Sequence, residues 1–189
     1  MEALYDSGGE LCVVMTLKDD KGRKKSGRVY LDEFCEKKGI SLYKIDHVND
    51  DEVHSLIQEY NLDRLFIIGW SQIANKRLLD SPNRGVLGMH PSLLPIGRGR
   101  AAIPWAIIKN LQKTGVTLFK LDEGVDTGPI FLQVEIPLSD KITASDLYEK
   151  VDTAHIELMK IAVSKIIQDN NLGFIAHPNN IEQIKGIFM

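Results

Sequence analysis

The sequence predicts an α/β protein with a mostly parallel, twisted sheet and helices on both faces. First, apolar segments of strand length recur along the chain, such as RLFIIGW at 64–70. Second, segments with apolar residues at helical spacing separate these strands. Third, boundary signals such as Gly39 fall between the two kinds of segment. Continuous apolar strands that alternate with helices are typical of a Rossmann-like parallel sheet covered on both sides.

The elements follow in a regular order. Strands are expected at 11–17, 41–45, 64–70, 85–89, 115–121 and 130–138. Helices are expected at 30–39, about 50–60, 74–80, 105–111 and 143–168. The charged segment 18–28 fits either a solvated loop or a lid that contacts phosphate.

The last helix has the clearest local signals. Thr143 and Asp146 have the spacing of a capping box. One apolar stripe follows, which we interpret as core packing: Leu147, Val151, Ala154, Leu158 and Ala162.

The beginning of the chain departs from this order. Residues 2–5 are typical of the end of a helix, whereas a doubly wound fold opens with a buried strand. We therefore expect a single domain over residues 1–189 that is truncated at the N-terminus. After the long helix, little chain remains for a C-terminal accessory domain.

The composition favours one ordinary domain with a sizeable core. The chain has 189 residues, of which 43% are hydrophobic and 26% charged. No apolar run of about 18 residues and no signal-peptide pattern occurs, so we expect a cytoplasmic protein without a membrane partner. The formal net charge of −3 disfavours nucleic acid as a partner.

Polar residues follow two of the expected strands. His90 comes directly after strand 85–89, and Asp126 lies in the connection after strand 115–121. Because ligands bind outside the carboxyl ends of parallel strands, both residues are expected at one edge of the sheet. Asp126 would then tune the imidazole or relay a proton. A structural histidine and a polar loop are the simpler alternatives.

Two arginines follow His90. Arg98 and Arg100 lie among Gly97 and Gly99, and arginines on such a loop suit phosphate recognition, although they could also be merely solvated. Several motifs are absent: GxxxxGK[ST], GxGxxG after a strand, HExxH and paired CxxC. This disfavours a nucleotide hydrolase, a conventional dehydrogenase and a zinc enzyme, and no metal site is predicted.

Four segments together resemble the folate-dependent formyltransferases, the group that includes glycinamide ribonucleotide transformylase, methionyl-tRNA formyltransferase and the sugar-nucleotide N-formyltransferases. The segments are HPSLLP at 90–95, RGRAAIPWAI at 98–107, TGVTLFKL at 114–121 and VDTGPI at 125–130. The likeness covers most of the chain from about 63 to 168, and the separations between the segments make it specific. It implies the formyltransferase fold.

The resemblance implies formyl transfer from 10-formyltetrahydrofolate to an amine, without a metal. His90 matches the family's catalytic histidine, which contacts the formyl oxygen, and Asp126 matches the aspartate that organises proton transfer. The residues that would face the folate are Gly69, Trp70, Ser71, Gln72, Ile73, Asp122, Glu123, Gly124 and Val125.

The resemblance also bears on the acceptor. Ser92, Arg98 and Arg100 fall on the side that the family uses for the acceptor. The run RGRA with Trp105 behind it is most similar to the sugar-nucleotide branch, which implies a small amine acceptor such as a nucleotide-linked amino sugar. The oligomeric state stays open, with a homodimer as one candidate.

One position departs from the family pattern. The family places an asparagine two residues before the histidine, whereas this chain has Gly88. Losing one oxyanion donor typically costs about 100- to 1000-fold in turnover. Three explanations stay open: Ser92, Gln72 or a water replaces the donor; transfer is slow; or the protein binds folate without transferring the formyl group. Methionyl-tRNA formyltransferase-like activity and hydrolysis of the formyl donor are further alternatives.

Overall fold

The computed structural model describes residues 1–23, 28–169 and 172–177. The chain divides into two compact units. The larger unit comprises residues 1–9, 66–69 and 86–189, and the smaller unit comprises residues 10–65 and 70–85.

The smaller unit is built on two parallel strands. Its elements are β1 (Val13–Leu17), α2 (Asp19–Gly22), α3 (Asp32–Lys38), β2 (Ser41–Ile45), α4 (Asp51–Glu59) and α5 (Lys76–Leu79). Strands β1 and β2 pair in parallel from Val13 opposite Ser41 to Leu17 opposite Ile45. Helix α3 ends where Gly39 adopts a left-handed conformation with φ of 67°. This part of the chain confirms the predicted strand–helix–strand order.

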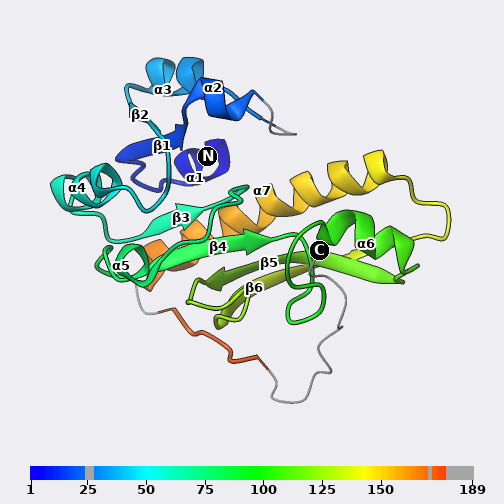
Figure 1. Cartoon of the computed structure of the whole chain (residues 1–189). Coiled ribbons are helices and arrows are strands. Elements are labelled where there is room, and N and C mark those ends of the chain that lie inside the picture. Colours follow the sequence, from blue (N-terminus) through cyan, green and yellow to red (C-terminus); the bar gives the residue numbers. More distant parts are fainter. Residues whose placement is uncertain (24–27, 170–171, 178–189) are drawn as a thin grey trace. The chain divides into compact units, whose positions relative to one another are not determined.

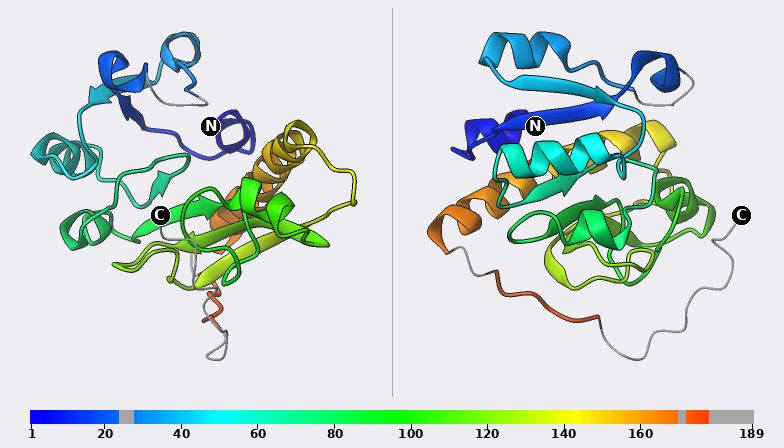
Figure 2. Two further views of the ribbon diagram at one scale, coloured as in Figure 1. Left: turned by 45° about the vertical axis from the view of Figure 1, so that its right-hand side comes forward. Right: turned by 60° about the vertical axis from the view of Figure 1, so that its left-hand side comes forward.

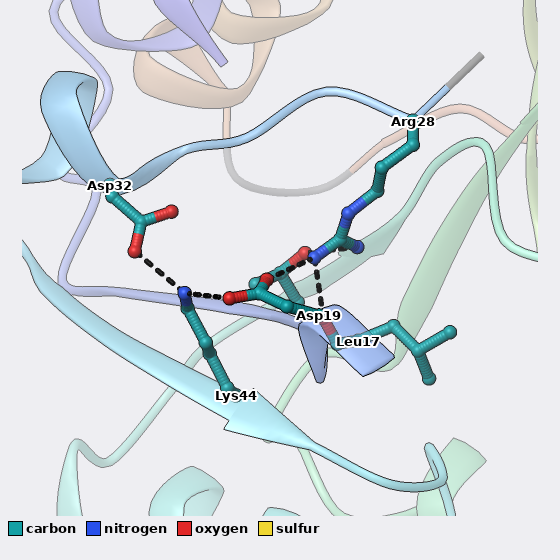
Figure 3. Close-up of polar contacts among 6 residues, drawn as sticks. Leu17, Asp19, Arg28, Asp32 and Lys44 are labelled. Carbon is teal, nitrogen blue, oxygen red and sulfur yellow. Dashed lines mark hydrogen bonds and ion pairs between the residues drawn. The ribbon is translucent and has the colours of Figure 1, made fainter. Parts of the chain in front are cut away.

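An ion-pair network lies at the ends of β1 and β2 (Figure 3). Arg28 donates to the carbonyl oxygen of Leu17 at 2.5 Å and lies 3.3 Å from Asp19. Lys44 contacts Asp19 and Asp32, each at 2.7 Å. The hydrogen bond from Lys44 lowers the pKa of the Asp19 carboxyl below its ordinary value. The segment predicted as a charged loop therefore includes a short helix and an anchored arginine, whereas residues 24–27 lie outside the described residues.

The larger unit contains a four-stranded sheet in the order β3–β4–β5–β6. Its elements are α1 (Glu2–Asp6), β3 (Leu65–Ile67), β4 (Val86–His90), α6 (Ala102–Ile108), β5 (Lys113–Lys120), β6 (Ile130–Pro137) and α7 (Ala144–Gln168). Residue 65 of β3 belongs to the smaller unit. Strands β4 and β5 pair antiparallel, and so do β5 and β6. The α/β class is thus confirmed, although β4, β5 and β6 pair antiparallel.

Helix α7 covers one face of this sheet (Figures 1 and 2). The predicted capping box is present, since Thr143 accepts from the Asp146 N–H and Asp146 accepts from the Thr143 N–H. The hydrogen bond from Thr143 lowers the pKa of the Asp146 carboxyl. The predicted apolar stripe is buried throughout, as Leu147, Val151, Ala154, Leu158 and Ala162 all lie in the core with residues of β4, β5, β6 and α6. No helix among the described residues has the length and apolar character needed to cross a membrane.

We expect Leu158→Ala to lower the free energy of unfolding by about 2–5 kcal/mol, because a buried leucine leaves a cavity that collapses only partly. Leu158 is 1% exposed, whereas Ile156 on the same helix is 49% exposed. Ile156→Ala is therefore the matched control, and we expect a change within about 0.5 kcal/mol. Urea unfolding of both variants measures this difference, and equal losses would contradict the placement of α7.

Candidate active site

His90 is the last residue of β4 and is 9% exposed. It lies opposite Thr117 in the antiparallel pair of β4 and β5. Its Nε2 atom is 2.7 Å from the carbonyl oxygen of Gly97, and its Nδ1 atom is 3.5 Å from Oδ2 of Asp126. The ring is thus held by one short hydrogen bond and faces a carboxylate on its other side.

Asp126 is placed by its backbone and by a loop amide. It has a φ of 52°, in the left-handed region that aspartate tolerates better than most residues. Its Oδ2 atom also accepts a hydrogen bond from the Gly99 N–H at 2.7 Å. The same oxygen therefore contacts the loop after β4 and faces the histidine at the end of β4.

The structure brings His90 and Asp126 together for a different reason from the predicted one. The prediction placed them at the common carboxyl edge of parallel strands, and this premise is wrong because β4 and β5 are antiparallel. Their carboxyl ends point in opposite directions. The residues meet because the connections 91–101 and 121–129 lie against each other, joined by the Gly99–Asp126 hydrogen bond.

A buried hydroxyl supports the loop after His90. Thr117 is 0% exposed, donates to the Ser92 carbonyl oxygen at 2.6 Å and accepts from the Leu94 N–H at 3.0 Å. The side chain of Gln133 donates to the Leu94 carbonyl oxygen and to Thr117, each at 2.8 Å. The adjacent Leu94–Pro95 peptide bond is cis. The segment HPSLLP is therefore fastened to β5 and β6 through side chains.

The end of the Leu121 side chain occupies the space beside Gly88, the position at which the family has an asparagine. A Cβ atom added to Gly88 would lie 2.6 Å from Cδ2 of Leu121 and 3.5 Å from the Ile67 carbonyl oxygen. A separation of 2.6 Å is below van der Waals contact, so the leucine would have to move. Leu121 itself packs against the cluster of Leu94, Phe119 and Ile130. A side chain at residue 88 would therefore require the end of the Leu121 side chain to shift.

The two side chains suggested as replacement donors already have partners. Ser92 is 5% exposed, and its hydroxyl donates to the Ile96 carbonyl oxygen at 2.8 Å. In the smaller unit, Gln72 donates to the Asp46 carbonyl oxygen and accepts from Trp70 and from the Val48 N–H. Ser92 therefore supports its own loop, and Gln72 holds its own segment.

The two arginines of the loop have different environments. Arg98 is half-buried, and its Nη2 atom lies 2.7 Å from Nδ1 of His177. Arg100 is exposed. An exposed guanidinium beside a partly buried one is compatible with an anion at this loop.

The predicted folate residues are divided between the units. Gly69 belongs to the larger unit, has a φ of 66° and is exposed. Residues 70–73 belong to the smaller unit, where Ser71 is exposed and Ile73 is 72% exposed. Trp70 donates its indole N–H to Gln72 at 2.9 Å.

The connection after β5 is exposed but internally ordered. Asp122 accepts from the Gly124 N–H at 3.1 Å and from the Thr127 hydroxyl at 2.6 Å. Glu123 and Val125 are exposed, and the side chain of Val125 is 43% exposed. This loop therefore offers a fixed backbone and an apolar side chain to a ligand.

Three contributors were missed by the sequence reasoning. Thr117 and Leu121 look like ordinary residues of an apolar strand, and His177 does not follow an expected strand as His90 does. His177 is half-buried and bonds Arg98 and the Gly128 carbonyl oxygen. A second histidine, His155 on α7, contacts the Val151 carbonyl oxygen at 2.8 Å. Burial lowers the pKa of His155, and the charge of His90 acts in the same direction.

Comparison with known proteins identifies the relatives of the chain. A family profile described as formyl transferase matches residues 3–163. The methionyl-tRNA formyltransferase of Clostridioides difficile (strain 630) is 35% identical over 173 residues, which is 90% of this chain and 56% of that protein. The chain thus spans about half the length of the curated relatives it matches.

Solved structures of formyltransferases have a fold similar to that of this chain. The phosphoribosylglycinamide formyltransferase of Bacillus halodurans superimposes with a TM-score of 0.77 at 26% identity, covering 90% of both chains. A sugar 3N-formyl transferase crystallised with dTDP and 5-N-formyl-THF gives a TM-score of 0.71 at 25% identity, covering 93% of this chain and 60% of that one. The architecture is therefore that of a formyltransferase-fold protein. More specifically, the chain belongs to the folate-dependent formyltransferase family.

We expect Thr117→Val to lower the free energy of unfolding by about 1–3 kcal/mol, because the buried partners of the hydroxyl lose their hydrogen bonds. Thr117→Ser keeps the hydroxyl but deletes a methyl group, and it is the control for loss of the hydroxyl. Chemical denaturation of both variants provides the measurement. If valine were as stable as threonine, the hydroxyl would not be holding the HPSLLP loop.

Gly88→Asn alone should displace Leu121 and destabilise the protein by about 1–3 kcal/mol through overpacking. Combining it with Leu121→Ala should relieve part of this loss, because the truncated side chain leaves room for the amide. Thermal unfolding of both single variants and the double variant measures the coupling. Strictly additive losses would show that Leu121 does not occupy the space beside residue 88.

Proposed function

We propose that this chain transfers the formyl group of 10-formyltetrahydrofolate to a primary amine. The pairing of His90 with Asp126 carries the proposal, because a histidine 3.5 Å from a carboxylate can move a proton during acyl transfer. Membership of the folate-dependent formyltransferase family supports the same chemistry.

The Gly97 carbonyl oxygen selects the tautomer of His90. A carbonyl only accepts, so Nε2 of His90 carries the hydrogen in their 2.7 Å contact. In the neutral ring, Nδ1 then has a lone pair and can act as a base. Once Nδ1 takes up a proton, the imidazolium lies beside the Asp126 carboxylate, which stabilises the positive charge.

This arrangement gives a balanced proton path. The amine nitrogen attacks the formyl carbon, and Nδ1 of His90 takes the proton that the nitrogen must lose. The imidazolium can donate a hydrogen bond to the tetrahedral oxyanion and then deliver the proton to N10 of the folate. Breaking the bond between carbon and N10 releases the formamide product and tetrahydrofolate.

Stabilisation of the oxyanion is the weak part of the proposed mechanism. Gly88 has no amide side chain, and Leu121 fills the space beside it. We therefore propose that transfer is slower, by roughly 100- to 1000-fold, than it would be with an additional side-chain donor. His90 remains as the donor in its protonated form.

The formyl donor is proposed to bind along the loop 122–125 of the larger unit. Asp122 fixes the loop backbone, while Val125 stays exposed, which suits contact with a flat ring through backbone groups. The sugar 3N-formyl transferase crystallised with 5-N-formyl-THF supports a folate of this kind as the donor.

We propose a nucleotide-linked amino sugar as the acceptor. Arg98 and Arg100 provide cationic groups on the loop that also holds His90, which suits a phosphate attached to a small amine. The sugar 3N-formyl transferase crystallised with dTDP supports this class of acceptor.

Methionyl-tRNA is the second candidate acceptor, because curated relatives about one-third identical to this chain carry that name. Two observations weigh against it. The formal net charge is −3, and three lysines of the smaller unit already contact its carboxylates. Lys18 and Lys21 contact Asp46, each at 2.6 Å, and Lys44 contacts Asp19.

The proposed activity is tested by incubating the full chain with 10-formyltetrahydrofolate and an amino-sugar nucleotide, methionyl-tRNA or no acceptor. We expect tetrahydrofolate to form with the amino-sugar nucleotide. His90→Ala should lower the rate at least about 100-fold, because the proton-transfer group is lost. Asp126→Asn should also slow the reaction, whereas Asp140→Asn, at an exposed aspartate outside the site, is the matched control.

Each other outcome has a distinct meaning. Formylation of methionyl-tRNA alone would replace the proposed acceptor and keep the reaction. Formate release without an acceptor would indicate hydrolysis of the donor. Saturable folate binding without turnover on any amine would indicate a binding protein, and turnover that is indifferent to His90 would overturn the assigned site.

A further inference from the structure

The segment 172–177 is held along the beginning of β6. Leu172 is 9% exposed and belongs to the core of the larger unit. The ring of Phe174 lies 5.8 Å from that of Phe131. Ile175 and Ile130 exchange two backbone hydrogen bonds of 2.7 and 2.8 Å. This segment therefore reaches His177 with a fixed direction.

His177 joins the two connections that form the site. Its Nδ1 atom is 2.7 Å from Nη2 of Arg98, in the connection after β4. Its Nε2 atom is 2.7 Å from the carbonyl oxygen of Gly128, in the connection after β5. An arginine can only donate and a carbonyl can only accept, so the ring is neutral with its hydrogen on Nε2. The contacts with Arg98 and with Gly128 therefore require the same tautomer of His177, the one with hydrogen on Nε2.

Arg98 lies between the two backbone groups that hold the His90–Asp126 pair. Gly97, the preceding residue, supplies the carbonyl oxygen that contacts His90. Gly99, the following residue, supplies the N–H that contacts Asp126. Among the described residues, Nε of Arg98 is buried without a hydrogen-bond partner. The hydrogen bond to His177 thus holds the Arg98 guanidinium at Nη2, while its Nε–H has no hydrogen-bond partner among the described residues.

We propose that His177 is a positioning residue that holds Arg98 toward a phosphate group of the acceptor. This proposal takes one assumption from the proposed function, namely that Arg98 contacts the amine acceptor. In this role, Nδ1 of His177 fixes one edge of the guanidinium, and the Nε2–H bond to Gly128 fixes the imidazole. Losing the Arg98 contact would leave the arginine present but free to adopt other rotamers, which weakens anion binding.

The chain offers two substitutions that separate the contacts of His177. The amide oxygen of His177→Asn can take the place of Nδ1 and accept from Arg98. The amide nitrogen of His177→Gln can take the place of Nε2 and donate to Gly128, with no acceptor left for Arg98. Ile175→Ala is the control, because its side chain is 66% exposed and its contacts to Ile130 are made by the backbone.

The test is the binding of inorganic pyrophosphate to the full chain, measured by calorimetry, so that no formyl transfer is needed. We expect the Kd to rise about tenfold in His177→Gln and His177→Ala, and to stay within about threefold of wild type in His177→Asn and Ile175→Ala. In an Arg98→Ala background, His177→Gln should have no further effect.

Three binding results would overturn the proposal. One is equal weakening by the Asn and Gln variants, and another is a His177→Gln effect that persists without Arg98. The third is the absence of measurable pyrophosphate binding to the wild-type chain. Imidazole NMR adds a test without ligand, in which His177 should show hydrogen on Nε2, and a different tautomer would also overturn the proposal. If binding and NMR agree while no amine is formylated, the fault lies with the proposed reaction and not with His177.

Discussion

The candidate site depends on one carboxylate that touches two separate parts of the larger unit. Oδ2 of Asp126 accepts the Gly99 N–H at 2.7 Å and faces Nδ1 of His90 at 3.5 Å. The connection after β4 and the connection after β5 meet at this atom. Because β4 and β5 are antiparallel, the sheet alone would keep the carboxyl ends of these strands apart. A side-chain contact therefore produces the geometry on which the proposed chemistry relies.

The shape around Gly88 gives the site its second constraint. Leu121 lies where a side chain at residue 88 would begin, and it also packs with Leu94 of the HPSLLP loop. The absence of a side chain at Gly88 thus leaves room for Leu121, and Leu121 connects the sheet to the HPSLLP loop through its contact with Leu94. In the proposed reaction, stabilisation of the oxyanion falls more heavily on His90, whose ring contacts the Gly97 carbonyl oxygen.

Much of this arrangement could be predicted from local patterns. The capping box at Thr143, the buried stripe of α7 and the position of His90 at a strand end follow from residue types and spacing. The antiparallel pairing of β4, β5 and β6 could not, because buried strands of either direction are similarly apolar. The roles of Thr117, Leu121 and His177 depend on contacts between distant segments, which periodicity does not record.

A crystal structure of the full chain with 5-formyltetrahydrofolate, a stable analogue of the formyl donor, would show whether His90 and Asp126 form the reaction centre. We predict that the folate ring lies against the loop 122–125. We also predict that the formyl group lies within about 3.5 Å of Nδ1 of His90, the separation expected for reacting groups. A folate bound with its formyl group directed away from both His90 and Asp126 would contradict the claim that these two residues form the reaction centre.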